Sequence, residues 1–534
     1  MTLRRVTPAS AWWLHDSAGS RAAEQAGLAS LPPHTLMQRA GTSVARLALA
    51  IAPHARLVRV MAGPGNNGGD GYVAAAWLHR AGRRVDVVAW GDPARLQGDA
   101  AWAHAQARAA GVEVRTPQVE MDGTAPDLVI DALLGLGTTR AITGPLADAV
   151  AVMNGSGAPV LAVDLPSGLA ADTGAAPGPV VQATHTLALL TLKPGLFTAA
   201  GRDACGALWF DDLDAPAAPD TACARLSGPP AASTRRHGSH KGSYGDTAVV
   251  GGAPGMTGAA WLAARAALAA GAGRVYASPL DHTAPMLAPA WPELMGRHAI
   301  WLEPPARLRE LTVVCGCGGG AVVRGALPPL LAHAPRLVLD ADALNAIAAD
   351  QGLRQALCSR GARGLATVLT PHPLEAARLL GSDTGSVQAD RLRAATALAR
   401  ELGCVVLLKG SGSVIAAPQT RPVLNPSGNA LLAGGGTGDV LAGWVGGLWA
   451  QLAAARSEPP AAGVDSSAHA AHGSHTAWQA AWQAARAATW LHGHAADRQL
   501  ATAECTPGLR AGDLVERMRE LAAVRRASPP ARQP

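Results

Sequence analysis

The sequence is poor in charged residues and has no long uninterrupted apolar run. Charged residues make up only 16% of the 534 residues and apolar residues 49%, a balance typical of a globular chain rather than a disordered one. No window of about 18 uninterrupted apolar residues occurs, and no apolar segment follows the basic residues near the start. We therefore expect neither a membrane span nor an export signal.

The sequence also has few cysteines, and its basic residues are not clustered. The seven cysteines lack C-x-x-C spacing, since the only close pair is Cys315 and Cys317. This spacing argues against a disulfide framework, so we expect reduced thiols in a cytoplasmic protein. The net charge is +6, but basic residues are scattered in pairs such as Arg83-Arg84 rather than gathered into a stripe. That distribution argues against nucleic acid as a partner.

Strand and helix patterns fall into two series, and the chain is longer than one hydrophobic core usually supports. In the first 200 residues, helical periodicity near 35–52 and 71–81 flanks apolar runs such as LVRVMA at 57–62 and VDVVAW. A second series begins at DTAVVGG and continues through RLVLDADAL, GLATVLTPH and CVVLLKG. Alternating strands and helices of this kind predict parallel sheets. We therefore predict two three-layer α/β domains.

The boundary between the two series lies in a segment without periodicity. Residues 214–236 are rich in Ala, Pro and Ser, which is typical of a linker. We expect the first domain over 1–220 and the second over 235–527. Within the second, the histidine-containing segment 455–480 has no recurring ligand spacing, so a flexible, solvated insertion explains it better than a metal site.

A glycine-rich motif, MAGPGNNGGDG at 61–71, follows a predicted strand and precedes a helical pattern. Successive backbone N–H groups in such a turn can bind an anion at the N-terminus of the helix. We expect Asp70 to cap that helix and Gly82 to end it. An ordinary glycine-rich turn is the alternative. The glycines expected to need positive φ in the turn are Gly63, Gly65, Gly68 and Gly69.

Two further strands of the first series end in carboxylates. DLVIDALL places Asp131 at a strand end, and VLAVDLPSGL places Asp164 at the end of the next. Ligands of open parallel sheets bind just outside these ends. Oxygen atoms of Asn67, Asp131 and Ser167 can therefore converge on a cation, while Asp164 and residues 135–141 face an organic substrate. A lone aspartate at a strand end is more often a helix cap.

The second series carries four motifs of its own. GGGTGDVLAG at 434–443 runs into a helical pattern with Asp439 in its first turn, where a phosphate can bind beside an acid or base. Segments 407–413, 370–380 and 240–276 each add a strand, a glycine-rich or proline-bounded turn, and polar residues. Taken singly, the glycine turn can be merely structural, and His372 can be a rigid-turn histidine.

In their sequence and order, these motifs resemble those of one family, the bifunctional NAD(P)H-hydrate repair enzymes. Members of this family fuse an NAD(P)H-hydrate epimerase to an ADP-dependent (S)-NAD(P)H-hydrate dehydratase. GPGNNGGDG, DALLGLG and DLPSG resemble the epimerase motifs, and HKGSYG, MTGAA, TPHPLE, KGSGS and GGGTGD resemble the dehydratase motifs. The likeness covers nearly the whole chain. It implies a Rossmann-like first domain and a ribokinase-like second domain.

The resemblance also implies roles for particular residues. The hydrate is expected at Asn66, Asn67, Gly68, Gly69, Asp70, Gly135, Leu136, Gly137, Thr138, Thr139, Arg140, Ala141 and Asp164 in the first domain, and at Ala259, Gly320, His372 and Asp439 in the second. Potassium is expected on Asn67, Asp131 and Ser167, and the adenine nucleotide on Lys409, Gly410, Ser411, Gly412, Ser413 and Gly438. Asp164 and Asp439 are the expected catalytic residues.

The implied chemistry has two steps. The epimerase interconverts the R and S hydrates, and the dehydratase removes water from the S form as ADP becomes AMP and phosphate. Hydroxide leaves poorly, so a kinase-like domain that phosphorylates the hydroxyl first, with Mg²⁺ neutralising the phosphates, explains the dehydration. The family's Gly-Pro-Gly-Leu-Gly turn reads Gly316-Cys317-Gly318-Gly319-Gly320 here, a departure that affects the alignment of Gly320.

Two other functions fit parts of the chain. A small-molecule kinase would use the same aspartate to activate a hydroxyl, but the GPGNNGGDG domain argues against it. The first domain could instead be a ligand-binding module without turnover, against which Asp131 and Asp164 argue. We expect a homo-oligomer acting on small molecules, the NADH and NADPH hydrates with ADP, and no membrane partner.

Overall fold

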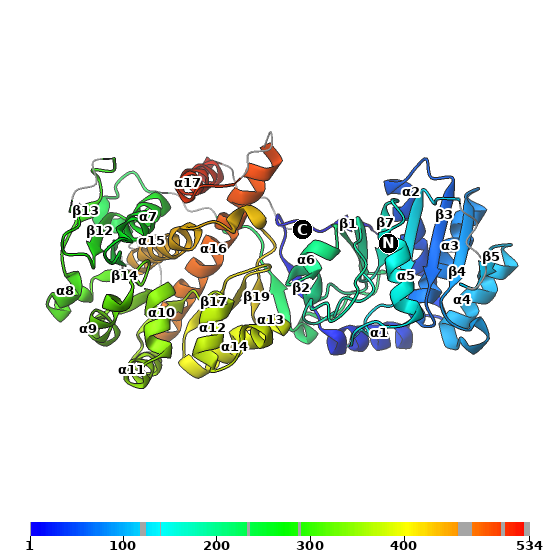
Figure 1. Ribbon diagram of the computed structural model, residues 1–534, viewed down its shortest axis with the longest axis horizontal. Coiled ribbons are helices and arrows are strands. Elements are labelled where there is room, and N and C mark those ends of the chain that lie inside the picture. The colour runs from blue at the N-terminus through cyan, green and yellow to red at the C-terminus, as the bar shows by residue number, and fades with distance from the viewer. Residues whose placement is uncertain are drawn as a thin grey trace, which may run out of the picture. The chain divides into compact units, whose positions relative to one another are not determined.

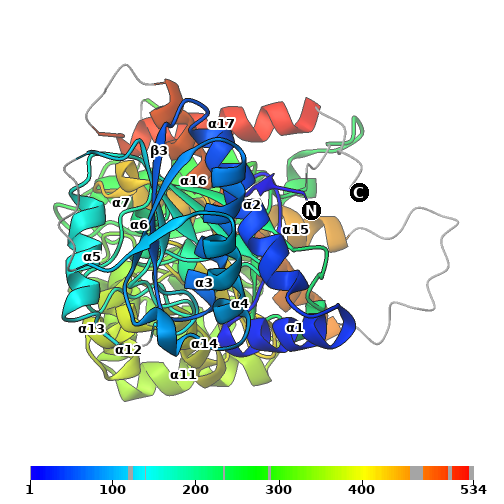
Figure 2. The same ribbon diagram turned by 90° about the vertical axis from the view of Figure 1, so that its right-hand side faces the viewer.

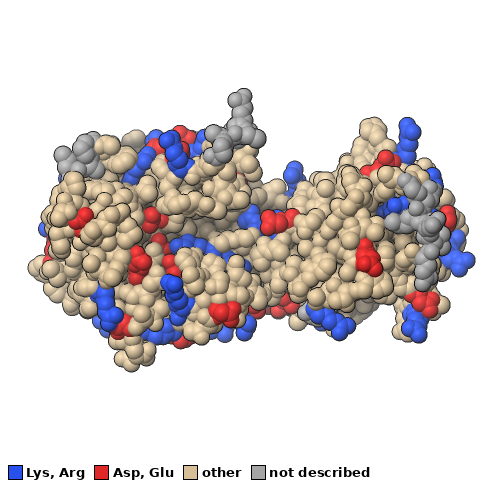
Figure 3. Space-filling view, in the orientation of Figure 1, with Lys and Arg blue, Asp and Glu red and all other residues tan. Residues whose placement is uncertain are grey.

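The structure is a computed structural model that describes residues 2–117, 124–138, 140–231, 235–286, 290–457, 473–502 and 508–527. The chain divides into two compact units, Met1–Leu226 and Ser227–Pro534 (Figure 1). The division lies inside the segment 214–236. Basic and acidic side chains are interspersed on the face of the molecule shown in Figure 3.

The first unit is built on a sheet with the strand order β1-β9-β8-β7-β6-β3-β4-β5. Its pairs are parallel except for β1 and β9. The strands of this sheet are β1 (Arg4–Arg5), β3 (Leu57–Ala62), β4 (Arg84–Ala89), β5 (Glu113–Arg115), β6 (Leu128–Ala132), β7 (Val160–Val163), β8 (His185–Leu189) and β9 (Ala207–Asp211). Two more strands of the unit, β2 (Trp12–Leu14) and β10 (Ala224–Leu226), lie outside this sheet. The helices are α1 (Ser17–Ser30), α2 (Thr35–Ile51), α3 (Asn66–Arg80), α4 (Gly98–Ala109), α5 (Pro145–Asn154) and α6 (Gly201–Ala204).

Alternating side chains of these strands enter two separate apolar clusters. Val58 and Val60 of β3 pack in one cluster with α2, α3 and α4, whereas Met61 packs in the other with α5. Figure 2 shows α5 on one side of β3 and α2, α3 and α4 on the other. Because side chains alternate along a strand, apolar residues at successive positions of β3 are buried on opposite faces of the sheet. The predicted three layers are confirmed.

Part of the segment predicted as a linker belongs to the first unit. Residues Ala224–Leu226 form β10, which pairs antiparallel with β2. The segment's Ala and Pro content hid this strand because a pairing of only three residues leaves no visible period in the sequence.

The second unit has the strand order β13-β12-β11-β14-β15-β16-β17-β18-β19. Pairs from β13 to β17 are parallel, and β17, β18 and β19 pair antiparallel. The strands are β11 (Asp246–Gly251), β12 (Arg274–Pro279), β13 (Met295–Gly296), β14 (Leu311–Cys315), β15 (Arg336–Leu339), β16 (Ala366–Leu369), β17 (Val405–Leu408), β18 (Val414–Ala416) and β19 (Val423–Leu424). The helices are α7 (Thr257–Ala270), α8 (Pro305–Leu308), α9 (Leu327–His333), α10 (Ala341–Ala348), α11 (Gln351–Ala362), α12 (Pro373–Leu380), α13 (Thr384–Ala389), α14 (Arg391–Leu402), α15 (Thr437–Ser457), α16 (Gly473–Thr502) and α17 (Ala511–Ala527).

Helices cover both faces of this second sheet (Figure 1). α7, α15, α16 and α17 pack on one face around Trp444, Trp449 and Trp490, each at most 2% exposed. α10, α11, α12 and α14 lie on the other face. Small residues let α15 approach α7 closely, since a Cβ on Gly443 would lie 2.0 Å from the carbonyl oxygen of Ala263.

The predicted insertion 455–480 is helical at both of its described ends. Its first residues end α15, and residues 473–480 begin α16, where Trp478 packs against the core. Residues 458–472 lie outside the described part of the chain. No helix among the described residues has the length and apolar character needed to cross a bilayer.

Candidate functional site

A cavity of about 480 Å³ opens in the first unit at the carboxyl ends of its strands. Its walls combine the start of α3, the turn after β6, the end of β7 and the segment after β8. This is the edge where open parallel sheets bind ligands. The predicted site residues that line it are Asn66, Asn67, Asp70, Gly135, Leu136, Gly137 and Asp164.

The remaining described residues predicted for this site do not line the cavity. Thr138, Arg140 and Ala141 are described but do not line the cavity, and Thr139 lies outside the described residues. Gly68 and Gly69 are buried in the first turn of α3 behind the cavity wall. Asn66, Asn67 and Asp70 of the motif therefore line the cavity, whereas Gly68 and Gly69 pack in the interior.

The glycines of the GPGNNGGDG motif are needed for space and not for positive φ. The prediction of positive φ is wrong, because none of Gly63, Gly65, Gly68 and Gly69 has it. Instead, a Cβ on Gly63 would lie 1.9 Å from the carbonyl oxygen of Leu133, and one on Gly68 would lie 2.0 Å from that of Gly63. The turn after β3 thus packs backbone to backbone against the turn after β6, and the first turn of α3 packs in the same way against Gly63.

Asp70 is not the N-cap of its helix, so that prediction is also wrong. α3 begins at Asn66 with Gly65 as its N-cap, because the Asn-Asn-Gly-Gly residues form the first helical turn instead of a preceding loop. The Asp70 side chain then lines the cavity. Burial and, next in size, the nearby Asp164 carboxylate raise the pKa of Asp70 well above its usual value. The end of the helix is as predicted, with Ala81 as its C-cap and Gly82 at φ 80° directly after this cap.

Asp164 forms a buried ion pair with Lys193, which was not predicted. The Lys193 ammonium donates to Asp164 Oδ1 and, at 2.8 Å, to the carbonyl oxygen of Leu189. Lys193 is only 1% exposed, yet it and Asp164 both line the cavity. Asp164 has φ 64°, a conformation that Asp tolerates better than most residues. The pair therefore presents a fixed acid and base to the cavity.

Asp131 and Ser167, two of the predicted cation ligands, are in direct contact. Asp131 accepts hydrogen bonds from the Ser167 hydroxyl at 2.6 Å, from the Ser167 N–H at 2.8 Å and from the Leu133 N–H at 3.2 Å. Both side chains are fully buried, and burial raises the pKa of Asp131 to about 6. The third predicted ligand, Asn67, contacts the turn after β6: a Cβ on Gly135 would lie 3.3 Å from Asn67 Oδ1.

In the second unit, the ends of β15 and β17 meet the N-terminus of α15. The Lys409 ammonium, just after β17, lies 2.7 Å from Asp340 Oδ1, just after β15. A Cβ on Gly438 would lie 3.4 Å from the same ammonium nitrogen, so Lys409 also borders the first turn of α15. Asp439 lies in that turn, as predicted. This cluster thus contains a cation, a helix N-terminus and two carboxylates. The cation and the helix N-terminus can bind a phosphate group, and a carboxylate can accept a proton.

The electrostatics of this cluster favour a proton acceptor at Asp439. Burial and then the neighbouring Asp340 carboxylate raise the pKa of Asp439 to about 6. Lys409 lowers it, but with a smaller effect. A carboxylate with a raised pKa holds a proton more strongly than an ordinary one and still ionises near neutral pH.

His372 is the N-cap of α12. Its Nδ1 accepts the N–H groups of Leu374 and Glu375 at 3.1 and 3.3 Å, and Glu375 Oε2 accepts the His372 N–H at 2.8 Å. This is the rigid-turn role considered from the sequence. The half-buried ring also places Nε2 3.1 Å from Glu375 Oε1. Burial and then Lys409 lower the pKa of His372, so His372 is close enough to the cluster to sense its charge.

The other predicted residues of the second unit lie on two turns and in the first turn of α7. The turn from Lys409 to Ser413 is closed by a hydrogen bond from the Ser413 hydroxyl to the Gly410 carbonyl oxygen at 3.2 Å. Ala259 packs beside Gly318, and the Gly320 N–H donates to Asp342 Oδ2 at 2.8 Å. The glycine turn after β14 therefore lies against the start of α7.

Two important residues were missed although the sequence held a signal for each. Asp340 follows a strand in RLVLDADAL, the same pattern that singled out Asp131 and Asp164. Lys193 is the one cation in the apolar stretch LALLTLKPGLF, and a lysine so placed is buried only when it has a partner.

Both halves of the chain match known families. The first matches the family described as YjeF-related protein N-terminus over residues 33–195, and the second matches NAD(P)H-hydrate dehydratase over residues 247–519. The bifunctional NAD(P)H-hydrate repair enzyme Nnr of Escherichia coli (strain K12) is 37% identical over 456 residues, which cover 83% of this chain and 86% of that protein. The chain belongs to the family of bifunctional NAD(P)H-hydrate repair enzymes.

A second relative and one solved structure are also similar to this chain. The Vibrio cholerae Nnr enzyme is 33% identical over 91% of this chain and 93% of its own length. A crystal structure of the ADP/ATP-dependent NAD(P)H-hydrate dehydratase from Bacillus subtilis, with ATP and Mg²⁺, is 25% identical, covers 55% of this chain and 94% of that chain, and has a TM-score of 0.41.

Proposed function

We propose that this chain repairs hydrated NADH and NADPH in two steps. The first domain interconverts the R and S hydrates, and the second removes water from the S hydrate while ADP becomes AMP and phosphate. The observation that carries the proposal is the presence of two separate sites in one chain, the cavity with Asp164 and Lys193 and the cluster of Asp340, Lys409 and Asp439. The repair enzymes that the chain resembles in sequence support the same assignment.

In the second domain, Asp439 accepts the proton of the hydrate's hydroxyl group. The hydroxyl oxygen then bonds to the terminal phosphorus of ADP as the bond to AMP breaks. Lys409 and the backbone N–H groups at the start of α15, Gly438 among them, hold the transferred phosphate. Phosphate leaves the ring more readily than hydroxide, and loss of a ring proton then restores the reduced nicotinamide.

The nucleotide and the hydrate would occupy opposite sides of this cluster. The turn Lys409–Ser413 binds the nucleotide, while Ala259, Gly320 and His372 face the hydrate. Mg²⁺ bound with the nucleotide would supply charge neutralisation at the phosphates, and Asp340 is the carboxylate of this cluster that is not assigned to the proton.

In the first domain, interconversion requires a bond at C6 of the hydrate to break and to form again on the other face. This chemistry needs a group that gives a proton and one that takes it. The Lys193 ammonium and the Asp164 carboxylate supply both, and Asp70, whose pKa is well above the usual value, is a second acid on the same wall. The residues from Gly135 to Ala141 and Asn66 to Asp70 complete the hydrate site.

Potassium would bind beside that cavity at Asp131, Ser167 and Asn67. All three side chains offer oxygen atoms, which hard cations prefer. Asn67 Nδ2 is buried with no hydrogen-bond partner among the described residues, and Asn67 Oδ1 is the atom that can bind the ion. Asp131 supplies the one formal charge of the set.

A single assay tests the proposal. Purified protein is mixed with R and S NADPH hydrates and either ADP or ATP, and the recovery of reduced-nicotinamide absorbance is followed. We expect recovery of both hydrates with ADP, because the epimerase feeds the dehydratase. Recovery of the S form alone would contradict the epimerase assignment, and a strict requirement for ATP would favour the kinase hypothesis.

A further inference from the structure

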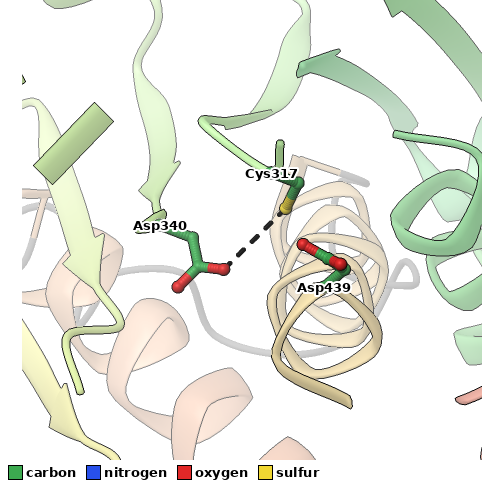
Figure 4. A group of neighbouring side chains, drawn as sticks. All are labelled: Cys317, Asp340 and Asp439. Carbon is green, nitrogen blue, oxygen red and sulfur yellow. Dashed lines mark hydrogen bonds between the residues drawn. The ribbon is translucent and has the colours of Figure 1, made fainter. Parts of the chain in front are cut away.

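Three metal-binding atoms converge in the second domain, and one of them is a thiol. Cys317 Sγ, an Asp340 oxygen and an Asp439 oxygen all lie within 4.8 Å of one another. They come from three elements, the turn after β14, the end of β15 and the first turn of α15. Figure 4 shows the Asp340 and Asp439 carboxylates on either side of the Cys317 sulfur.

The separation of these atoms suits a tetrahedral metal ion. Two donors of a tetrahedral zinc site, one sulfur at about 2.3 Å and one oxygen at about 2.1 Å, lie about 3.6 Å apart. Cys317 Sγ lies 3.9 Å from Asp340 Oδ2, so this pair needs to contract by only a few tenths of an ångström. Cys317 and Asp340 are buried, whereas Asp439 is half-buried.

Neighbouring groups hold two of the three donors in place. Asp340 Oδ1 accepts from the Lys409 ammonium and the Thr370 hydroxyl, each at 2.7 Å, which leaves Oδ2 facing the thiol. Cys317 stands between Gly316 and Gly318, whose φ angles are 120° and 55°. Such outer contacts orient metal ligands. The donors are therefore arranged before any ion arrives.

We infer that Cys317, Asp340 and Asp439 bind a thiophilic divalent cation such as Zn²⁺, and that the bound ion blocks the dehydratase. Coordination releases the thiol proton to solvent, and the three negative charges are then balanced by the ion and the Lys409 ammonium. The thiolate selects against Mg²⁺, which prefers oxygen ligands. A bound ion occupies the Asp439 carboxylate, so Asp439 can no longer accept the substrate proton.

Binding is tested by titrating the full-length protein with Co²⁺, whose bond to a thiolate gives a charge-transfer absorption band. We expect one equivalent to develop this band in the wild-type protein. Cys317→Ala should abolish it, and Asp439→Asn, which keeps the side-chain shape, should weaken Co²⁺ binding by about 10-fold or more. Cys358→Ala is the matched control, since it removes a partly buried thiol of α11 in the same domain and should leave the band intact.

Inhibition is tested with Zn²⁺ in the presence of excess Mg²⁺, each variant being compared with its own zinc-free rate. We expect Zn²⁺ to inhibit dehydration but not epimerisation, and Cys317→Ala to raise the inhibitory concentration by about 10-fold or more. Absence of the cobalt band in the wild-type protein, an unchanged band in Cys317→Ala, or binding without inhibition would each overturn the inference. The inhibition experiment rests on the proposed function, whereas the cobalt titration decides the metal site even if no dehydratase activity is found.

Discussion

Replacing Asp131 separates a metal-binding role in the first domain from a purely structural one. If Asp131 is the anionic ligand of a potassium ion, Asp131→Ala removes both a charge and a coordinating atom. Ser167→Ala removes only a neutral oxygen, so it should cost less epimerase activity. Asp131→Asn keeps an oxygen and nearly the same shape, and we expect its activity to fall between the other two.

The structure indicates that Asp131→Ala stays folded. The substitution leaves the N–H groups of Ser167 and Leu133 without an acceptor, at about 1–3 kcal/mol each, while the Ser167 hydroxyl can still donate to the Leu134 carbonyl oxygen at 3.2 Å. Burial raises the pKa of Asp131 from 3.8 to about 6, so the ionised carboxylate itself costs about 3 kcal/mol at neutral pH. The net loss of unfolding free energy is then at most about 3 kcal/mol, less than a domain's usual stability.

The assay is exchange between the R and S hydrates, measured for each variant in potassium, sodium and lithium salts at a temperature well below its unfolding midpoint. We expect the wild-type protein to respond to the cation, Ser167→Ala to respond weakly and Asp131→Ala to lose both exchange and response. If Asp131→Ala is less stable yet keeps wild-type exchange and cation response, Asp131 only holds the turn after β6 and the potassium assignment is wrong.

Three further predictions follow from the two sites. Asp439→Asn should abolish ADP-dependent dehydration while epimerisation persists, and loss of both activities in a folded variant would refute the two-site model. Because the pKa of Asp439 is raised to about 6 and the ionised form is the base, the dehydration rate should rise with pH through about 6 and then level off; a rate that falls over this range would contradict the role of Asp439. Lys193→Met leaves the buried Asp164 carboxylate without its ammonium and should lower the unfolding free energy of the first domain by about 3–5 kcal/mol. The double variant Asp164→Asn, Lys193→Met should regain much of that stability, as denaturant titration can show, but not the epimerase activity.

Several features of the site could be predicted from the sequence because they depend on local pattern. Apolar runs such as LVRVMA fix β3, and a carboxylate directly after such a run, as at Asp131 and Asp164, lies at the ligand-binding edge of a parallel sheet. The glycine-rich segment GGGTGD, which begins at residue 434, likewise predicted that Asp439 lies in the first turn of a helix. These inferences need only the alternation of strands and helices along the chain.

Only the tertiary contacts showed the roles of the glycines and the partners of the buried polar side chains, because the same residue type can have more than one structural role. The glycines at 63 and 68 admit a close backbone approach that no local signal distinguishes from a need for positive φ. The partner of Asp164 is 29 residues away in the chain, and only the meeting of β7 with the segment after β8 shows that it is Lys193. The convergence of Cys317, Asp340 and Asp439 requires three strand and helix ends to meet. The sequence alone thus determined which elements form and which ends carry chemistry, whereas the packing of those ends determined which side chains act together.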